Sequence, residues 1–190
     1  MMSEVVLNTG DTAWMLMSCA LVLLMTPGLA LFYGGMVRAK GVLNMMMMSF
    51  ISMGIVSILW VLYGYSMSFG KDLGGGLLGD PFEMFGLTDQ IASDSFFGTI
   101  PTSVFVAFQA MFAVITVALI SGAIADRAKF GGWIVFVVVW STVVYFPVAH
   151  WVFDFDSGDN DPGGWIANQL KAIDFAGGTA VHINAGIAAL

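Results

Sequence analysis

His182 is the residue whose type and position suggest chemistry most clearly. It follows Asp174 by eight positions in an apolar run, so a helix over this run would carry it about 12 Å into a membrane. An ionisable side chain at that depth indicates function by default, although it could instead bond a neighbouring helix. Apolar surroundings favour the neutral imidazole, which has one donor and one acceptor nitrogen. His182 therefore suits proton transfer or the binding of a small polar solute.

Asp174 stands at the expected mouth of the same run. Its carboxylate could cap the helix through the backbone N–H of Ala176 or Gly177. It could also attract a cation, and the two roles are compatible because a capped carboxylate still contributes negative potential. Asp174 is therefore a candidate for attracting a cation at the entrance to a path that leads to His182.

Aromatic residues form a second group of candidates. Phe108 and Phe112 are four positions apart and share one face of a helix. Trp151 and Phe153 lie near the end of another apolar run, where an interfacial belt of rings is common. Such rings pack against lipid or protein in most membrane helices. Their functional alternative is a cage for a cation, worth about 0.5–2 kcal/mol per ring.

The elements that position these residues are membrane helices. Of the 190 residues, 58% are apolar and 10% are charged, with a mean hydropathy of +0.88, whereas a soluble domain carries about 25% charged residues. The sequence predicts an all-α polytopic membrane protein. We expect spans at about 12–33, 42–69, 101–125, 133–153 and 175–190. The last run corresponds to about 24 Å of helix, and it carries no stop signal, so we expect the helix to continue beyond Leu190.

The charges of the loops predict the orientation. The turns after the first and third spans carry Arg38, Lys40, Arg127 and Lys129 against the single acid Asp126. The N-terminal tail and the other two loops carry the remaining twelve acids. Basic residues in short loops mark the cytoplasmic side, so we expect a multi-pass protein of the cell membrane with its N-terminus outside. An odd number of spans predicts that a following half would form an inverted repeat.

Other function classes find little support in the sequence. Cys19 is the single cysteine, and the two histidines fall in different spans, so neither a disulfide framework nor a metal-binding pattern is present. No phosphate-binding loop, cofactor motif or activated nucleophile occurs. A retinal-type pump would need a lysine within a span, and none of the five spans contains one. We therefore expect no enzyme activity, no cofactor, no metal and no nucleic-acid partner.

Four motifs occur in order along the sequence: Pro27–Gly35 (PGLALFYGG), Phe108–Phe112 (FQAMF), Tyr145–His150 (YFPVAH) and Asp174–Gly186 (DFAGGTAVHINAG). Together they resemble the motifs of the ammonium transporter (Amt/Rh) family. The resemblance covers essentially residues 12–190, and it implies that residues 1–190 form the N-terminal half of an eleven-helix protomer. That protomer is expected to contain a five-plus-five inverted repeat and to assemble as a homotrimer with one pore per subunit.

The resemblance also implies roles for individual residues. Family members recruit ammonium at an outer aromatic site, deprotonate it, and conduct ammonia along a histidine-lined pore, with or without separate proton transfer. Phe112, with Phe108 beside it, resembles the gate, His182 the first pore histidine, and Asp174 the acid that supports recruitment. Phe153 stands where many members have a tryptophan, and its cation–π face is weaker. The second gate ring, a serine and the partner histidine would lie in the missing C-terminal half.

Two alternatives remain open at the level of the sequence. The first is a channel for another small neutral solute, such as water or urea. The second is an ammonium sensor built on the same membrane fold. Comparing the uptake of methylammonium with that of water and urea would test the first, and a fused cytosolic signalling domain would support the second.

Overall fold

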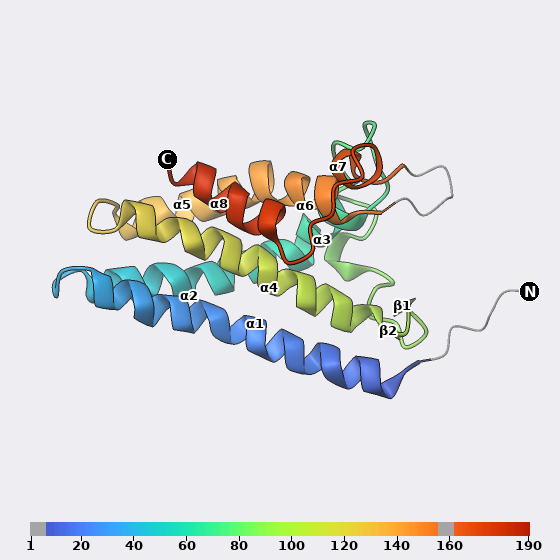
Figure 1. Ribbon diagram of the computed structural model, residues 1–190, viewed down its shortest axis with the longest axis horizontal. Helices are drawn as coiled ribbons and strands as arrows, with labels where there is room; N and C mark the ends of the chain where they lie inside the picture. The colour runs from blue at the N-terminus through green and yellow to red at the C-terminus, as the bar shows by residue number, and fades with distance from the viewer. Residues whose placement is uncertain (1–6, 156–161) are drawn as a thin grey trace, which may run out of the picture.

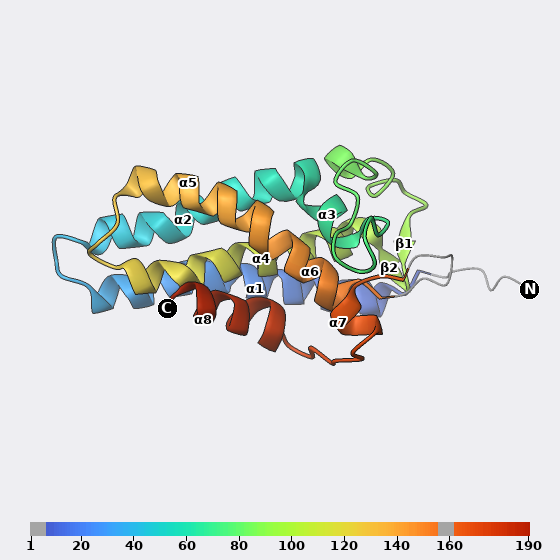
Figure 2. The same cartoon turned by 90° about the horizontal axis from the view of Figure 1, so that it is seen from above.

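The computed structural model describes residues 7–155 and 162–190. Glu4, Asp156, Asp159 and Asp161, which belong to the acids counted above, lie outside the described residues. Figure 1 shows a bundle of long helices with irregular loops gathered at one end, and Figure 2 shows the same bundle from above. The segments are α1 (Thr9–Met36), α2 (Val42–Leu59), η1 (Trp60–Gly64), α3 (Tyr65–Phe69), η2 (Phe85–Leu87), β1 (Phe96–Phe97), β2 (Ile100–Pro101), α4 (Thr102–Ile120), η3 (Ser121–Ile124), α5 (Phe130–Trp140), η4 (Ser141–Tyr145), α6 (Phe146–Phe153), α7 (Trp165–Asn168), η5 (Gly178–Ile183) and α8 (Asn184–Ala188).

Within the described residues, four helices are long and apolar enough to cross a membrane. They are Thr9–Met36, Val42–Phe69, Thr102–Ile124 and Phe130–Phe153, close to the first four spans that the sequence predicts. The fifth predicted span, 175–190, corresponds to the shorter continuous run of η5 and α8, which begins at Gly178. Residues 175–177 bend before that run instead of joining it.

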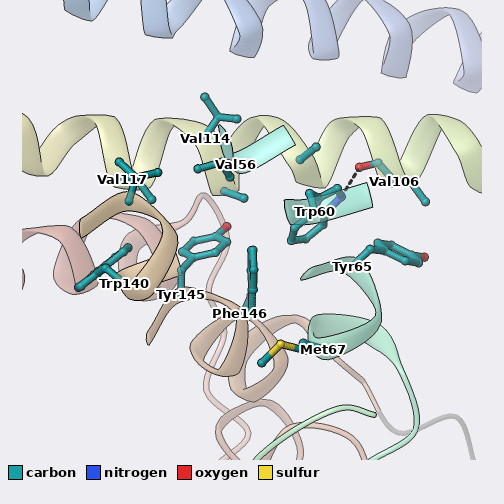
Figure 3. Close-up of a cluster of buried hydrophobic side chains, with 14 of the residues drawn as sticks. Val56, Trp60, Tyr65, Met67, Val106, Val114, Val117, Trp140, Tyr145 and Phe146 are labelled. Atoms are coloured by element: carbon teal, nitrogen blue, oxygen red, sulfur yellow. Dashed lines mark hydrogen bonds between the residues drawn. The ribbon is translucent and has the colours of Figure 1, made fainter. Parts of the chain in front are cut away.

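Helix α4 lies in the middle of the bundle and contacts α1, α2 and α8. Buried indoles help to hold the neighbouring spans to one another. The Nε1–H of Trp60 donates to the carbonyl of Val106 at 3.1 Å, as Figure 3 shows. The Nε1–H of Trp133 donates to the carbonyl of Met48 at 2.9 Å. A buried indole packs a large apolar surface and still satisfies its one donor.

Two neighbouring spans each contain one wide, π-helical turn, η1 in the second span and η4 in the fourth. The two turns are joined by the hydroxyls of Tyr63 and Thr142, which lie 2.8 Å apart. Next to them, a Cβ at Gly64 would lie 2.5 Å from Phe146 Cζ, so only glycine lets the ring of Phe146 pack here. A third wide turn, η5, contains His182. Such turns occur often at functional sites.

The loops divide between the two ends of the bundle. Figure 1 shows the α1–α2 and α4–α5 connections at one end, and β1, β2 and α7 at the other. The first two connections are the basic turns of the sequence. A Cβ at Gly41 would clash with the carboxylate of Asp126, which shows that these two turns lie close together. The acidic loops therefore share the opposite end with β1 and β2, which pair antiparallel with Phe96 opposite Pro101.

Candidate functional site

Two cavities meet at Phe112 of α4. The outer cavity, of about 230 Å³, lies towards the end that carries the acidic loops. The inner cavity, of about 350 Å³, lies further along α4. Phe112 and Ala176 line both. The outer cavity is lined by Phe108, Gln109, Phe112, Phe153, Phe155, Asp174, Phe175, Ala176 and Gly177. The inner cavity is lined by Met25, Gly28, Leu29, Phe32, Phe112, Ile115, Leu119, Ala176, Val181 and His182.

His182 reaches the inner cavity from the wide turn η5. The carbonyl of Gly177 accepts the backbone N–H of both Val181 and His182 at 3.0 Å. Gly177 has φ +77°, in the left-handed region where a side chain would be strained. The imidazole itself is exposed on the surface of the described chain. Of the residues that line the inner cavity in the described part of the chain, His182 alone carries a polar side chain.

Asp174 lines the outer cavity and caps η5. Its Oδ2 accepts the backbone N–H of Thr179 and of Ala180, each at 2.9 Å. The cap that the sequence suggested through Ala176 or Gly177 is therefore made two to four positions later, because the chain bends before the helical run begins. The other oxygen, Oδ1, is buried, and the described residues give it no hydrogen-bond partner.

The predicted aromatic residues fall into two places. The rings of Phe108 and Phe112 meet edge to face, with centroids 4.9 Å apart, and Phe153 joins them around the outer cavity. Trp151 does not line that cavity. Its Nε1–H donates to the carbonyl of Leu77 at 2.7 Å, and its ring packs against the indole of Trp165 in α7. The structure thus gathers Phe108, Phe112, Phe153 and Asp174, with His182 on the other side of Phe112.

Sequence reasoning missed two further rings at this site. Phe155 and Phe175 both line the outer cavity, and both are largely exposed. Each lies within two positions of a predicted site residue, Phe153 or Asp174. This closeness in sequence could have marked the two rings as site residues. Where they point, however, is decided by the bends after α6 and before η5.

His150 was also given no role by the sequence beyond its place in a motif. It is fully buried near the end of α6. Its Nδ1 lies 3.2 Å from the carbonyl oxygen of Ser68 and 3.4 Å from Asp154 Oδ2. Its Nε2 lies 3.3 Å from Asp72 Oδ1. A histidine four positions before an aspartate is a recognisable signal for ion pairing, but the contact with Asp72 depends on how the loop after α3 folds back.

The carboxyl group of Asp72 is stabilised in its charged form. Burial acts to raise its pKa, but hydrogen bonds from the backbone of Gly76, from His150 and from the backbone of Gly74 and Gly75 outweigh burial. The pKa of Asp72 therefore lies below its ordinary value. Within the part of the chain that the structure describes, no group of three or more His, Cys, Asp or Glu residues could hold a metal ion.

The sequence and the fold both have known relatives. Residues 13–190 match the sequence model of the Ammonium Transporter Family. An ammonium transporter of Mycobacterium tuberculosis is 62% identical over 196 aligned positions, which cover 95% of this chain and 41% of that protein. The chain thus spans less than half the length of that relative.

Solved structures agree with the sequence comparison. The crystal structure of Candida albicans Mep2 matches with a TM-score of 0.81 and 37% identity, over 96% of this chain and 38% of that one. A structure described as a sensor Amt protein matches with a TM-score of 0.76 and 26% identity, over 90% and 40% of the two chains. The match spans 178 of the 190 residues, and the helices it covers are those of a multi-pass membrane protein. The chain therefore belongs to the ammonium transporter family.

Proposed function

We propose that this chain forms the N-terminal half of an ammonium transporter, in which ammonium is captured in the outer cavity and ammonia passes Phe112 to reach His182. The observation that carries the proposal is the position of Phe112. Its ring lines both the cavity that holds Asp174 and Phe153 and the cavity that holds His182. A path between the two cavities along the chain described here would run past that ring.

The outer cavity suits a small cation. The carboxylate of Asp174 supplies negative potential, and the rings of Phe108, Phe153 and Phe155 offer π faces. Each ring contributes about 0.5–2 kcal/mol to cation binding. Moving a bare cation into hydrocarbon costs tens of kcal/mol by idealised estimates, on the order of ten times more than one ring returns. These contacts can therefore hold ammonium at the entrance but cannot carry it through an apolar pore.

Losing a proton near Phe112 removes most of this penalty. Neutral ammonia can then enter the inner cavity, where the walls are apolar apart from His182. A neutral imidazole can accept a hydrogen bond from ammonia or donate one to it. Potassium has no proton to lose, so deprotonation gives a selectivity that size alone does not provide. His182 also stands where a separate proton path would begin.

The proposal extends to the assembly and its setting. Basic residues in the two short turns favour the cytoplasmic side, so the N-terminus and the outer cavity face the outside of the cell membrane. The resemblance to the family supports a homotrimer of complete protomers, each with its own pore. The second half of each protomer would supply the partner histidine, the second gate ring and the serine.

Solid-supported-membrane currents on the complete transporter in liposomes test this proposal. We expect a current for ammonium pulses and none for potassium, or, for electroneutral conduction, an ammonium-driven pH change without current. Methylammonium uptake without water or urea permeation would exclude the neutral-solute channel. The likeness to the sensor Amt protein makes a sensor the second candidate. Ammonium binding without either flux or current would overturn transport in favour of that role.

A further inference from the structure

His150 is buried among hydrogen-bond acceptors. Nδ1 faces the carbonyl of Ser68 and the carboxylate of Asp154, and Nε2 faces the carboxylate of Asp72. The side chain of His150 is 0% exposed, and those of Asp72 and Asp154 are 4% and 16% exposed. A carbonyl or an ionised carboxylate has no proton to donate. Both ring nitrogens therefore have to act as donors for these contacts to be favourable.

Only the imidazolium form of histidine donates from both nitrogens. A neutral ring would turn one nitrogen lone pair towards an oxygen lone pair inside a buried site, where unsatisfied contacts are costly. A buried charge also needs charged partners, and two carboxylates supply them here. Tyr65 of α3 lies near Asp154, but a phenol is uncharged at neutral pH. Lys71, next to Asp72, is exposed.

The same cluster fastens a loop to the end of α6. Asp72 accepts the backbone N–H of Gly76 at 2.8 Å and of Gly74 at 3.2 Å. The carbonyl of Gly76 in turn accepts the backbone N–H of Trp165 at 3.2 Å. The carbonyl of Leu77 accepts the indole N–H of Trp151. Residues 72–77 are thus held against α6 and α7.

Phe153 lies in the same last turn of α6 as His150, three positions later. The backbone N–H of Asp154 closes that turn on the carbonyl of His150 at 3.3 Å. Any movement of His150 therefore moves the turn that presents the ring of Phe153 to the outer cavity. Asp154, one of the two carboxylate partners of the imidazole, directly follows Phe153 in the chain.

We propose that His150 is held as an imidazolium between Asp72 and Asp154 and acts as a positioning residue that keeps Phe153 at the outer cavity. The inference rests on the proposed function in one respect, because Phe153 matters only if the outer cavity captures ammonium. The charge state of His150 does not depend on that function. The two parts can therefore be tested separately.

The charge state is tested by ¹⁵N NMR of the complete transporter with labelled histidine, the signals of His150 being assigned by their loss in His150→Gln. At neutral pH we expect two protonated ring nitrogens for His150. One protonated and one unprotonated nitrogen would overturn the inference.

The positioning role is tested by ammonium transport kinetics of His150→Gln, Asp72→Asn and the double variant. Losing a charge-assisted contact should raise KM for ammonium about tenfold in each single variant, with the maximal rate per folded transporter almost unchanged. The KM of the double variant should be no higher than that of the more impaired single variant, because both changes break the same cluster. Asp80→Asn is the matched control, since Asp80 caps its own loop at the N–H of Phe82 without contacting His150.

If KM rises about a hundredfold in the double variant, the two single effects multiply and the positioning role is overturned. A loss of maximal rate with KM unchanged would overturn it as well. The same holds if Asp80→Asn raises KM as much as Asp72→Asn does. A wild-type protein that carries no ammonium would instead refute the proposed function. In that case the NMR experiment still decides the charge state of His150.

Discussion

The carboxylate of Asp174 accepts the backbone N–H of Thr179 at 2.9 Å. This bond connects the wall of the outer cavity to the wide turn that carries His182. The acidic residue that lines the outer cavity therefore also fixes the start of the helix that lines the inner cavity. The two roles can be separated, because a neutral amide keeps an acceptor oxygen and loses the charge.

Replacing Asp174 with asparagine or with alanine should give different results. Asn retains an oxygen for Thr179 and Ala180, so we expect the midpoint of thermal unfolding to change little while KM for ammonium rises. Ala removes the cap and should also destabilise the protein by about 0.5–2 kcal/mol. Unfolding in detergent and transport kinetics in liposomes measure the two effects. An Asn variant with wild-type KM would show that Asp174 only caps the helix.

Replacing His182 with leucine should reduce ammonium flux through the complete transporter about tenfold or more. The change removes the one polar side chain that the described residues place on the wall of the inner cavity, and one lost hydrogen bond corresponds to roughly this factor. Asn184→Leu is the matched control, because Asn184 bonds back to Ala180 within its own helix and does not line the cavity. Unchanged flux in His182→Leu would refute both the pore-lining and the proton-relay roles.

Replacing Phe153 with tryptophan should strengthen capture. Indole has the strongest cation–π face of the aromatic side chains, and a gain of about 0.5–1 kcal/mol would lower KM for ammonium about two- to fivefold. Phe82→Trp, on a ring exposed in the loop after α3, should leave KM unchanged. If both substitutions lower KM equally, the ring at position 153 has no specific part in recruitment.

Acid should weaken the contact between the loop and α6. Because the pKa of Asp72 is lower in the folded protein than its ordinary value, its carboxylate contributes stability above the ordinary carboxyl range. That contribution is lost as pH falls through the folded pKa. Asp72→Asn should therefore lower the unfolding midpoint at neutral pH by roughly 2–4 °C, and the difference from wild type should shrink in acid. A difference that stays constant down to pH 3 would contradict this assignment, and Asp80→Asn serves as the control.

Replacing Gly177 with alanine should destabilise the start of η5. The left-handed φ of +77° costs an L residue roughly 1–2 kcal/mol, and the added Cβ would lie 2.9 Å from the side chain of Val181. We expect the unfolding midpoint to fall by about 2–8 °C. Gly178→Ala is the control, since a Cβ there meets nothing within 4 Å. Equal midpoints for the two variants would show that the backbone conformation at Gly177 is not strained by a side chain.

The first four spans were predictable because a membrane requires long apolar helices with satisfied backbones. The start of the fifth helical run was not. Hydropathy places it at residue 175, whereas the carboxylate of Asp174 binds the amides of Thr179 and Ala180 and the helix begins at Gly178. Local hydrogen bonding decides this boundary, and an apolar pattern does not report it.

The sequence predicted the types of site residue better than their partners. Phe108, Phe112 and Phe153 line one cavity, and their roles as gate and recruitment site stay predictions. Trp151 lies instead against Leu77 and α7, because a loop distant in sequence folds back to offer its carbonyl. Asp72, one of the partners of His150, comes from the same loop. Contacts of this kind depend on tertiary structure, which periodicity and composition do not encode.

The wide turn η4 has a consequence for the rest of its span. A π-helical turn contains one residue more than an α-helical turn, so everything after it is rotated by about 100° around the helix axis. His150 and Phe153 both follow η4 in the same span. That single extra residue sets the direction in which both side chains leave the helix. His150 points towards Asp72 and Phe153 towards the outer cavity. Deleting one residue within Ser141–Tyr145 would leave an apolar span of nearly the same length with both side chains pointing elsewhere.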